Sequence, residues 1–317
     1  MAKNTLTCNT PGGGNTGTGS CVMKIGRIIG AISIPRGSEI DVSGDLASIK
    51  ALINAAILNN DPLARFYPIP NLVPQSDNTE DLSIQTYPDG TKVVTGEGDY
   101  DWTFDLLEGA NCLSSRLRKH NYQQEDILLI DENMQLLGQN GSTDAMLAGY
   151  NPSIFYALAP LPSQGIDSVT AYRWRLAFRK TQLADNLAWV SFGTDTYLRT
   201  IRGLQDVALS QGAARAGAVV TIKALTACGT VDLYTSYSAA LAKTTAWNVT
   251  RTSNGNVITI TSVVVNANAK AWTITVDDTD PDYSATAGQL TISLVGPASL
   301  AALSPAVKSY ESNTIAQ

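Results

Sequence analysis

The most regular pattern in the chain is an alternation of apolar and charged residues between positions 169 and 178. From Tyr172 to Phe178 every second residue is large and apolar, and two of the residues between them are the arginines Arg173 and Arg175. A period of two residues predicts a β-strand with one apolar face and one cationic face. The apolar positions are Tyr172, Trp174, Leu176 and Phe178.

Residues 101–106 predict a partner strand of opposite charge, in which Asp101 and Asp105 alternate with apolar residues. If the two strands lie in one sheet and share an aromatic core, the two aspartates and the two arginines lie on the same face. Carboxylates four residues apart along a strand are separated by about 13 Å, too far for the acid and base of a glycosidase. We interpret this face as a set of structural or inter-subunit ion pairs, or as a surface that lines a lumen.

Helices and hairpins are predicted around these strands. Apolar residues recur at three- and four-residue spacing up to Leu58, after the candidate caps Ser43 and Asp45, and predict a helix. Two shorter helices are expected at 111–120 and, capped by Thr181, at 182–190. Hairpins are expected at 82–95, around a Pro-Asp-Gly turn, and at 127–138. Further strands are expected at 24–34, with a bulge at its glycines, and at 154–159.

Two segments without periodicity are expected to be long loops. Residues 61–81 contain four prolines, and residues 139–152 are polar and contain two glycines. Loops of this length in a compact domain usually have a function. Together the elements predict a β-rich α+β domain over residues 22–203. A Gly/Thr/Asn-rich arm at 1–21 precedes it, and its composition favours disorder or ordering on a neighbouring subunit.

The sequence pattern changes after Gly203. Short alternating segments separated by turn residues predict strands at 219–227, 231–235, 246–252, 256–265, 271–277 and 289–296. Regular short strands over about 100 residues, with Trp247 and Trp272 as core aromatics, are typical of an immunoglobulin-like sandwich. We expect this domain to span residues 204–297 and a C-terminal tail to occupy 298–317.

The composition favours extensive contact between copies of the chain. Hydrophobic residues make up 44% of the 317 residues and charged residues only 16%, and charges are depleted at interface cores. The net charge of −6 argues against a nucleic-acid binder, but suits a conduit that nucleic acid passes without sticking. No apolar run predicts a signal peptide or a bilayer span, so we expect synthesis in a cytoplasm and no membrane contact.

Few residues suggest chemistry. His120 is the single histidine, and its neighbours Lys119 and Asn121 indicate neither an orienting carboxylate nor a nucleophile, so a structural role is expected. The cysteines have no metal-binding spacing, and we expect unpaired thiols in a reducing compartment. We therefore predict no enzymatic activity and no cofactor. The cysteines are Cys8, Cys21, Cys112 and Cys228.

The acidic segment 277–283 partly matches the start of a calcium loop, because Asp278, Asp280 and Asp282 occupy alternate positions. The glycine and glutamate that such a loop requires at its sixth and twelfth positions are replaced by Tyr283 and Gln289. An acidic turn between strands is therefore favoured, and the three aspartates are weak calcium candidates.

The five tryptophans could form a platform for sugars, but each lies among apolar neighbours, which favours packing in the core. They are Trp102, Trp174, Trp189, Trp247 and Trp272.

The layout of helix 45–58, loops 61–81 and 139–152, the two alternating strands and the sandwich after Gly203 resembles that of major tail tube proteins of long-tailed bacteriophages. The resemblance implies a tail-tube-like β-sandwich or barrel with a flanking helix, and long loops that join subunits into stacked rings. It also implies a virion tail protein made in the host cytoplasm. Its partners would be copies of itself and tail proteins such as the tape measure and the tail terminator, with DNA as passing cargo.

Two other functions stay open from the sequence. One is another virion shell component, such as a capsid or decoration protein, although the sequence shows no long spine helix. The other is a carbohydrate-binding or adhesive β-protein, which would need an export signal or an exposed aromatic platform, and the sequence shows neither.

Overall fold

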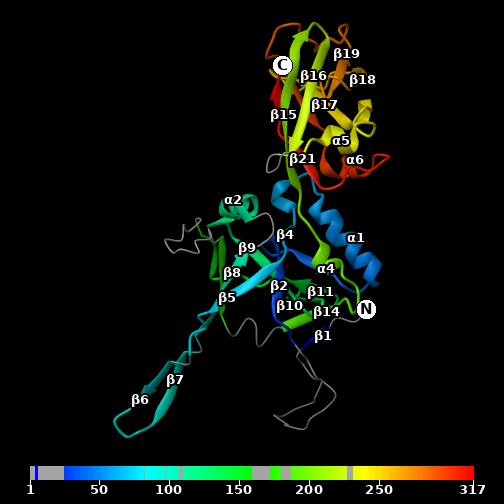
Figure 1. The fold of residues 1–317 in the computed structure, drawn as a ribbon. Coiled ribbons are helices and arrows are strands. Elements are labelled where there is room, and N and C mark those ends of the chain that lie inside the picture. Colours follow the sequence, from blue (N-terminus) through cyan, green and yellow to red (C-terminus); the bar gives the residue numbers. More distant parts are fainter. Residues whose placement is uncertain are drawn as a thin grey trace, which may run out of the picture. The chain divides into compact units, whose positions relative to one another are not determined.

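The computed structural model describes residues 4–5, 25–81, 83–96, 98–106, 110–158, 172–179, 187–226 and 231–317. The chain divides into two compact units. Unit 1 comprises residues 1–57 and 61–203, and unit 2 comprises residues 58–60 and 204–317. Both units consist mainly of β-strands, as the sequence predicts (Figure 1).

Unit 1 is built on two sheets. The strands of the first, in spatial order, are β1 (Asn4–Thr5), β14 (Leu187–Ser191), β10 (Gln135–Asn140), β9 (Glu125–Asp131), β2 (Ile28–Pro35) and β4 (Tyr67–Ile69), and β11 (Met146–Ala148) joins β10 to β3 (Glu39–Asp41). The strands of the second are β12 (Ile154–Ala157), β13 (Arg173–Arg179), β8 (Asp99–Leu106) and β5 (Leu72–Asp77). The bulge expected in β2 occurs between Ile28 and Gly30.

The first sheet has an apolar layer on each face. On one face Leu129 and Leu137 pack with Phe104 and Trp174 of the second sheet. On the other face Leu128 packs in a cluster with helix α1 (Leu46–Ile57). This explains the continuous apolar run of β9, because consecutive residues of a strand point to opposite faces and both faces are buried.

Helix α1 confirms the predicted amphipathic helix. Asp45 is its cap, because its Oδ1 accepts a hydrogen bond from the Ser48 N–H at 2.8 Å. Ile49, Ile53 and Ile57 are buried, whereas Leu52, expected on the same stripe, is 48% exposed. The second helix, α2 (Ala110–His120), also lies where the sequence predicts one.

The two predicted long loops are wrong. Residues 61–81 form a short 3₁₀ turn and the strands β4 and β5, and residues 139–152 contain β11 and the end of β10. The four prolines favoured a loop over strands. However, β4 and β5 are the edge strands of their sheets. An edge strand tolerates Pro68 and Pro74, because a missing N–H on the outer side costs no ladder hydrogen bond.

The helix predicted at 182–190 is also wrong over the residues that the structure describes. Residues 187–191 form β14, whereas Thr181 lies outside the described residues. Leu187 packs in the core between the two sheets and Val190 in the core under α1. Consecutive apolar residues on two buried faces fit a strand and a helix equally well by periodicity. A one-turn helix, α4 (Tyr197–Thr200), follows β14.

Unit 2 is a two-sheet sandwich around one core, in which the rings of Trp247 and Trp272 lie 5.8 Å apart. Its sheets are β18 (Ile260–Asn266), β19 (Ala271–Val276), β16 (Val219–Thr226), β15 (Gln205–Ala216) and β21 (Tyr310–Ser312), and β17 (Trp247–Arg251), β20 (Leu290–Leu294) and β22 (Ile315–Ala316).

Three details of unit 2 differ from expectation. β15 was not predicted, because many of its residues are small or polar and exposed. The expected strand at 231–235 is instead helix α5 (Leu233–Tyr237), capped by the Asp232 carboxylate, which accepts from the Tyr234 N–H. The expected tail belongs to the sandwich: after helix α6 (Pro297–Ala301), β21 pairs with β15 and β22 with β20.

Candidate functional site

The charged face predicted for the two alternating strands forms in unit 1. β13 pairs antiparallel with β8, which places Arg173 opposite Asp105 and Arg175 opposite Thr103. Trp174 is fully buried on the core side of β13. The shared face predicted from the sequence is confirmed, and its role between subunits stays a prediction.

Two ion pairs join the two aspartates and the two arginines within the subunit. Arg175 Nε donates to both carboxylate oxygens of Asp101, at 2.9 and 3.2 Å, and its Nη2 donates a further bond. The Asp101 side chain is 12% exposed and that of Arg175 45%, and the hydrogen bond to Asp101 raises the pKa of Arg175. Arg173 makes a single bond to Asp105, at 3.2 Å. The two pairs therefore add little net charge to this face.

The second feature is a hairpin with no supporting layer. Strands β6 (Ser83–Thr86) and β7 (Lys92–Gly96) follow β5 and precede β8 along the chain, and they form a separate two-stranded sheet (Figure 1). Gly90 closes the predicted turn at φ +85°, a conformation that favours glycine. Ile84 lies directly opposite Val94, and these side chains are 54% and 53% exposed.

The single histidine has the carboxylate partner that the sequence did not indicate. His120 Nδ1 lies 2.7 Å from Glu125 Oε1, and Ser33 Oγ donates to the other oxygen of Glu125. The carboxylate lies between the serine and the imidazole. In a catalytic triad the imidazole must contact the hydroxyl, so this arrangement holds the end of α2 against the first sheet and does not activate Ser33.

The acidic segment of unit 2 is a hydrogen-bonded turn. Asp280 accepts bonds from the N–H groups of Thr259 and Asp282, each at 3.0 Å. The Asp282 carboxylate accepts from the side-chain amides of Asn254 and Asn256. The bonds from the Thr259 and Asp282 N–H groups lower the pKa of Asp280. Within the described residues no cluster of three or more His, Cys, Asp or Glu side chains could hold a metal ion, so the calcium assignment of Asp278, Asp280 and Asp282 gains no support.

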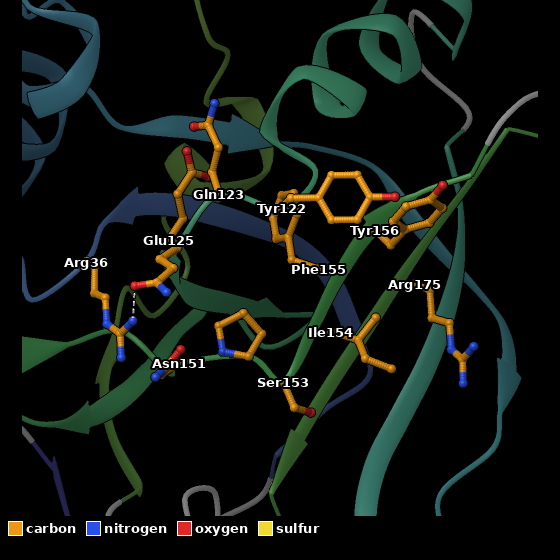
Figure 2. A pocket seen from close by; sticks show the side chains of 12 residues that line it. Arg36, Tyr122, Gln123, Glu125, Asn151, Ser153, Ile154, Phe155, Tyr156 and Arg175 are labelled. Atoms are coloured by element: carbon orange, nitrogen blue, oxygen red, sulfur yellow. Dashed lines mark hydrogen bonds between the residues drawn. The ribbon is translucent and has the colours of Figure 1, made fainter.

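An exposed aromatic pair was missed by the sequence analysis. Tyr122 is 87% exposed and Tyr156 is 38% exposed, and their ring centroids lie 5.8 Å apart. The two rings stand at one end of a cleft in unit 1, and Arg36 and Asn151 stand at the other end (Figure 2). No local pattern marks these residues, because they come from separate turns and from β12. The tryptophans, by contrast, are buried or half-buried, as predicted.

The thiol prediction is wrong for Cys112. Cys112, on α2, is disulfide-bonded, whereas the sequence predicted unpaired thiols. Cys8, Cys21 and Cys228 lie outside the described residues. The arm at 1–21 is described only at Asn4–Thr5, where it pairs with Ala188 and Trp189 of β14.

Comparisons with known proteins place the chain in no family. No family model matches the sequence, and no curated protein matches it significantly. None of the described helices has the length and hydropathy that crossing a membrane requires.

Proposed function

We propose that this chain is a self-assembling structural subunit of a bacteriophage virion, and specifically the major tail tube protein. In this role, copies of the chain stack as rings in the tail and surround a conduit for DNA. The observation that carries the proposal is the β6–β7 hairpin, whose residues are almost all exposed. The layout resemblance supplies the specific role.

A hairpin of two strands is only marginally stable in water. Ile84 and Val94 form an apolar pair on one of its faces, and Val93, 42% exposed, lies on the other. Contact with a second copy would bury these side chains, at about 1.5–3 kcal/mol for each one fully buried. A hairpin that binds a different surface on the next copy makes a head-to-tail contact, and such contacts propagate into rings or tubes.

The charge distribution supports the same role. Charged residues make up 16% of the chain, and the charges of Asp101, Asp105, Arg173 and Arg175 are paired inside the subunit. A tube lined by such surfaces would present few unpaired cations to the phosphates of passing DNA, which would therefore not be retained. Besides its own copies, the partners of the chain would be the tape measure and the tail terminator.

Negative-stain electron microscopy of the purified full chain tests the proposal. Rings or tubes of uniform diameter are the expected result. Closed shells would instead identify another virion component, such as a capsid or decoration protein. Dispersed single particles at every concentration and ionic strength would contradict self-assembly altogether.

A further inference from the structure

We propose that the cleft beside Tyr122 and Tyr156 is a binding site for an oligosaccharide. The cleft has a volume of about 450 Å³, within the range of sites for small ligands. It lies in unit 1 between the turn that carries Arg36, the turn after α2, and the segment that leads into β12 (Figure 2). The site is separate from the hairpin on which the proposed assembly depends.

The backbone of Tyr122 is the first observation. Tyr122 has a φ of +69°, a left-handed conformation that costs a bulky residue about 1–2 kcal/mol and that glycine adopts freely. Its ring is 87% exposed, so packing in the core does not offset that cost. A strained position that presents an aromatic ring to solvent is typical of a functional site.

Neighbouring residues hold Tyr122 in place. The Asn121 side chain donates from Nδ2 to the Ala157 carbonyl at 3.0 Å and accepts from the Ala157 N–H at 2.8 Å. This double hydrogen bond fastens the turn to the edge strand β12, which carries Tyr156. The neighbouring hydroxyl of Tyr156 raises the pKa of Tyr122. The two rings are therefore positioned before any ligand arrives, which lowers the entropic cost of binding.

The polar lining fits the rim of a sugar. A sugar ring has an apolar C–H face that stacks on an aromatic ring, and hydroxyls that need both donors and acceptors. Asn151 makes no hydrogen bond within the described residues, and its amide offers both kinds of group. Arg36 uses one N–H on Gln124 and has four others. The Glu125 carboxylate, held by His120 and Ser33, belongs to the cleft wall.

Aromatic grooves also bind proline-rich peptides, but the lining here favours a sugar. Three amide side chains surround the cleft, together with the guanidinium groups of Arg36 and Arg175 and a carboxylate, and these match a ligand with a hydroxyl at most of its carbons. The amides belong to Gln123, Gln124 and Asn151.

The experiment uses the full chain and a printed array of neutral and uronate-containing oligosaccharides. Calorimetry with the best-bound hexasaccharide then compares variants. Tyr122→Gly removes the ring and relieves the backbone, so its melting temperature should equal or exceed that of the wild type. Its affinity should fall at least about tenfold, as for an aromatic anchor. Asn151→Ala should weaken binding, and Tyr122→Phe, which keeps the ring, should bind within about threefold of the wild type.

Two controls separate this proposal from the proposed assembly. Tyr87→Ser removes an exposed tyrosine beside the hairpin turn, and Ile84→Thr with Val94→Thr removes the apolar pair; both proteins should bind the hexasaccharide like the wild type. The proposal is overturned if no oligosaccharide binds, if Tyr122→Gly binds as well as the wild type, or if the hairpin variant loses binding equally. It is also overturned if a proline-rich peptide binds at the cleft and no oligosaccharide does.

Discussion

Arg175 bonds to Asp101 although the residue directly opposite it in the sheet is Thr103. The guanidinium reaches diagonally along β8 and donates to both oxygens of the carboxylate. Arg173, in contrast, bonds to the directly opposite Asp105, and it does so through one nitrogen. The two ion pairs of one face therefore differ in geometry and in burial.

We expect the Asp101–Arg175 pair to stabilise the subunit more than the Asp105–Arg173 pair. Arg175→Gln leaves the Asp101 carboxylate, 12% exposed, without its charged partner, and should cost about 1–2 kcal/mol of unfolding free energy. Arg173→Gln should cost about 0.5 kcal/mol, because the Asp105 carboxylate is 28% exposed and accepts only one hydrogen bond from its arginine. Urea unfolding of each single and double mutant in a thermodynamic cycle measures both values. Equal coupling energies would contradict the expectation.

The hairpin residues should affect assembly without affecting folding. Threonine keeps the β-branched shape of a strand residue but removes apolar surface, so Ile84→Thr with Val94→Thr should leave the melting temperature of the dissociated subunit unchanged. If a second copy buries these side chains at about 1 kcal/mol each, the critical concentration for assembly should rise at least about tenfold. Sedimentation over a concentration series measures it.

Val264→Thr is the matched control for the hairpin variant. Val264 lies on β18 of unit 2 and is 59% exposed, so it is at least as exposed as the hairpin residues. The critical concentration should stay at the wild-type value. A comparable rise in this control would mean that the hairpin is not a specific contact.

The carboxyl group of Asp126 should make the protein less stable as pH rises. Asp126 is 7% exposed, its Oδ2 accepts a bond from the Gly37 N–H, and its Oδ1 has no hydrogen-bond partner. Burial raises its pKa above 3.8, while the hydrogen bond from Gly37 and the nearby Arg36 oppose the shift. The folded state then binds the proton more tightly than the unfolded chain, so this contribution to stability is present below pH 3.8 and is lost as pH rises through the folded-state pKa.

Asp126→Asn should therefore gain stability over the wild type as pH increases from about 3.8 to 7. The asparagine oxygen can still accept from Gly37. Asp45→Asn provides a control of opposite sign, because hydrogen bonds from Ser48 lower the pKa of Asp45, and that contribution is lost as pH falls. Melting temperatures of the three proteins across the pH range compare the slopes. A difference between Asp126→Asn and the wild type that does not change with pH would refute the assignment.

The sequence predicted those elements whose pattern is local. The alternation around Trp174, the stripe of α1 and the turn at Gly90 each depend on residues near one another in the chain. The strands β4 and β5 were missed because the tolerance of proline depends on a position at the sheet edge, which a sequence does not show. The pair His120–Glu125 was also missed, because a turn folds Glu125 back onto the end of α2.

The candidate sites divide in the same way. The ion-pair face followed from two alternating strands, because sharing a core fixes which side chains share the other face. The cleft at Tyr122 could not be predicted. It depends on a left-handed residue after α2 and on the contact of Asn121 with β12, and neither has a local signature.

Gly138 should be the most sensitive glycine in the first sheet. A Cβ atom there would lie 2.3 Å from the Ala148 carbonyl oxygen and 2.8 Å from Leu128 Cδ2, so Gly138→Ala must push β11 away from β10. The Tyr150 hydroxyl also donates to the Gly138 carbonyl. We expect a loss of about 2–3 kcal/mol in unfolding free energy. Gly203→Ala is the control: its Cβ would contact Pro68 at an ordinary 3.6 Å, and the change should stay within about 0.5 kcal/mol. Chemical denaturation measures the unfolding free energy of both variants. If Gly138→Ala is as stable as Gly203→Ala, β11 moves aside without cost.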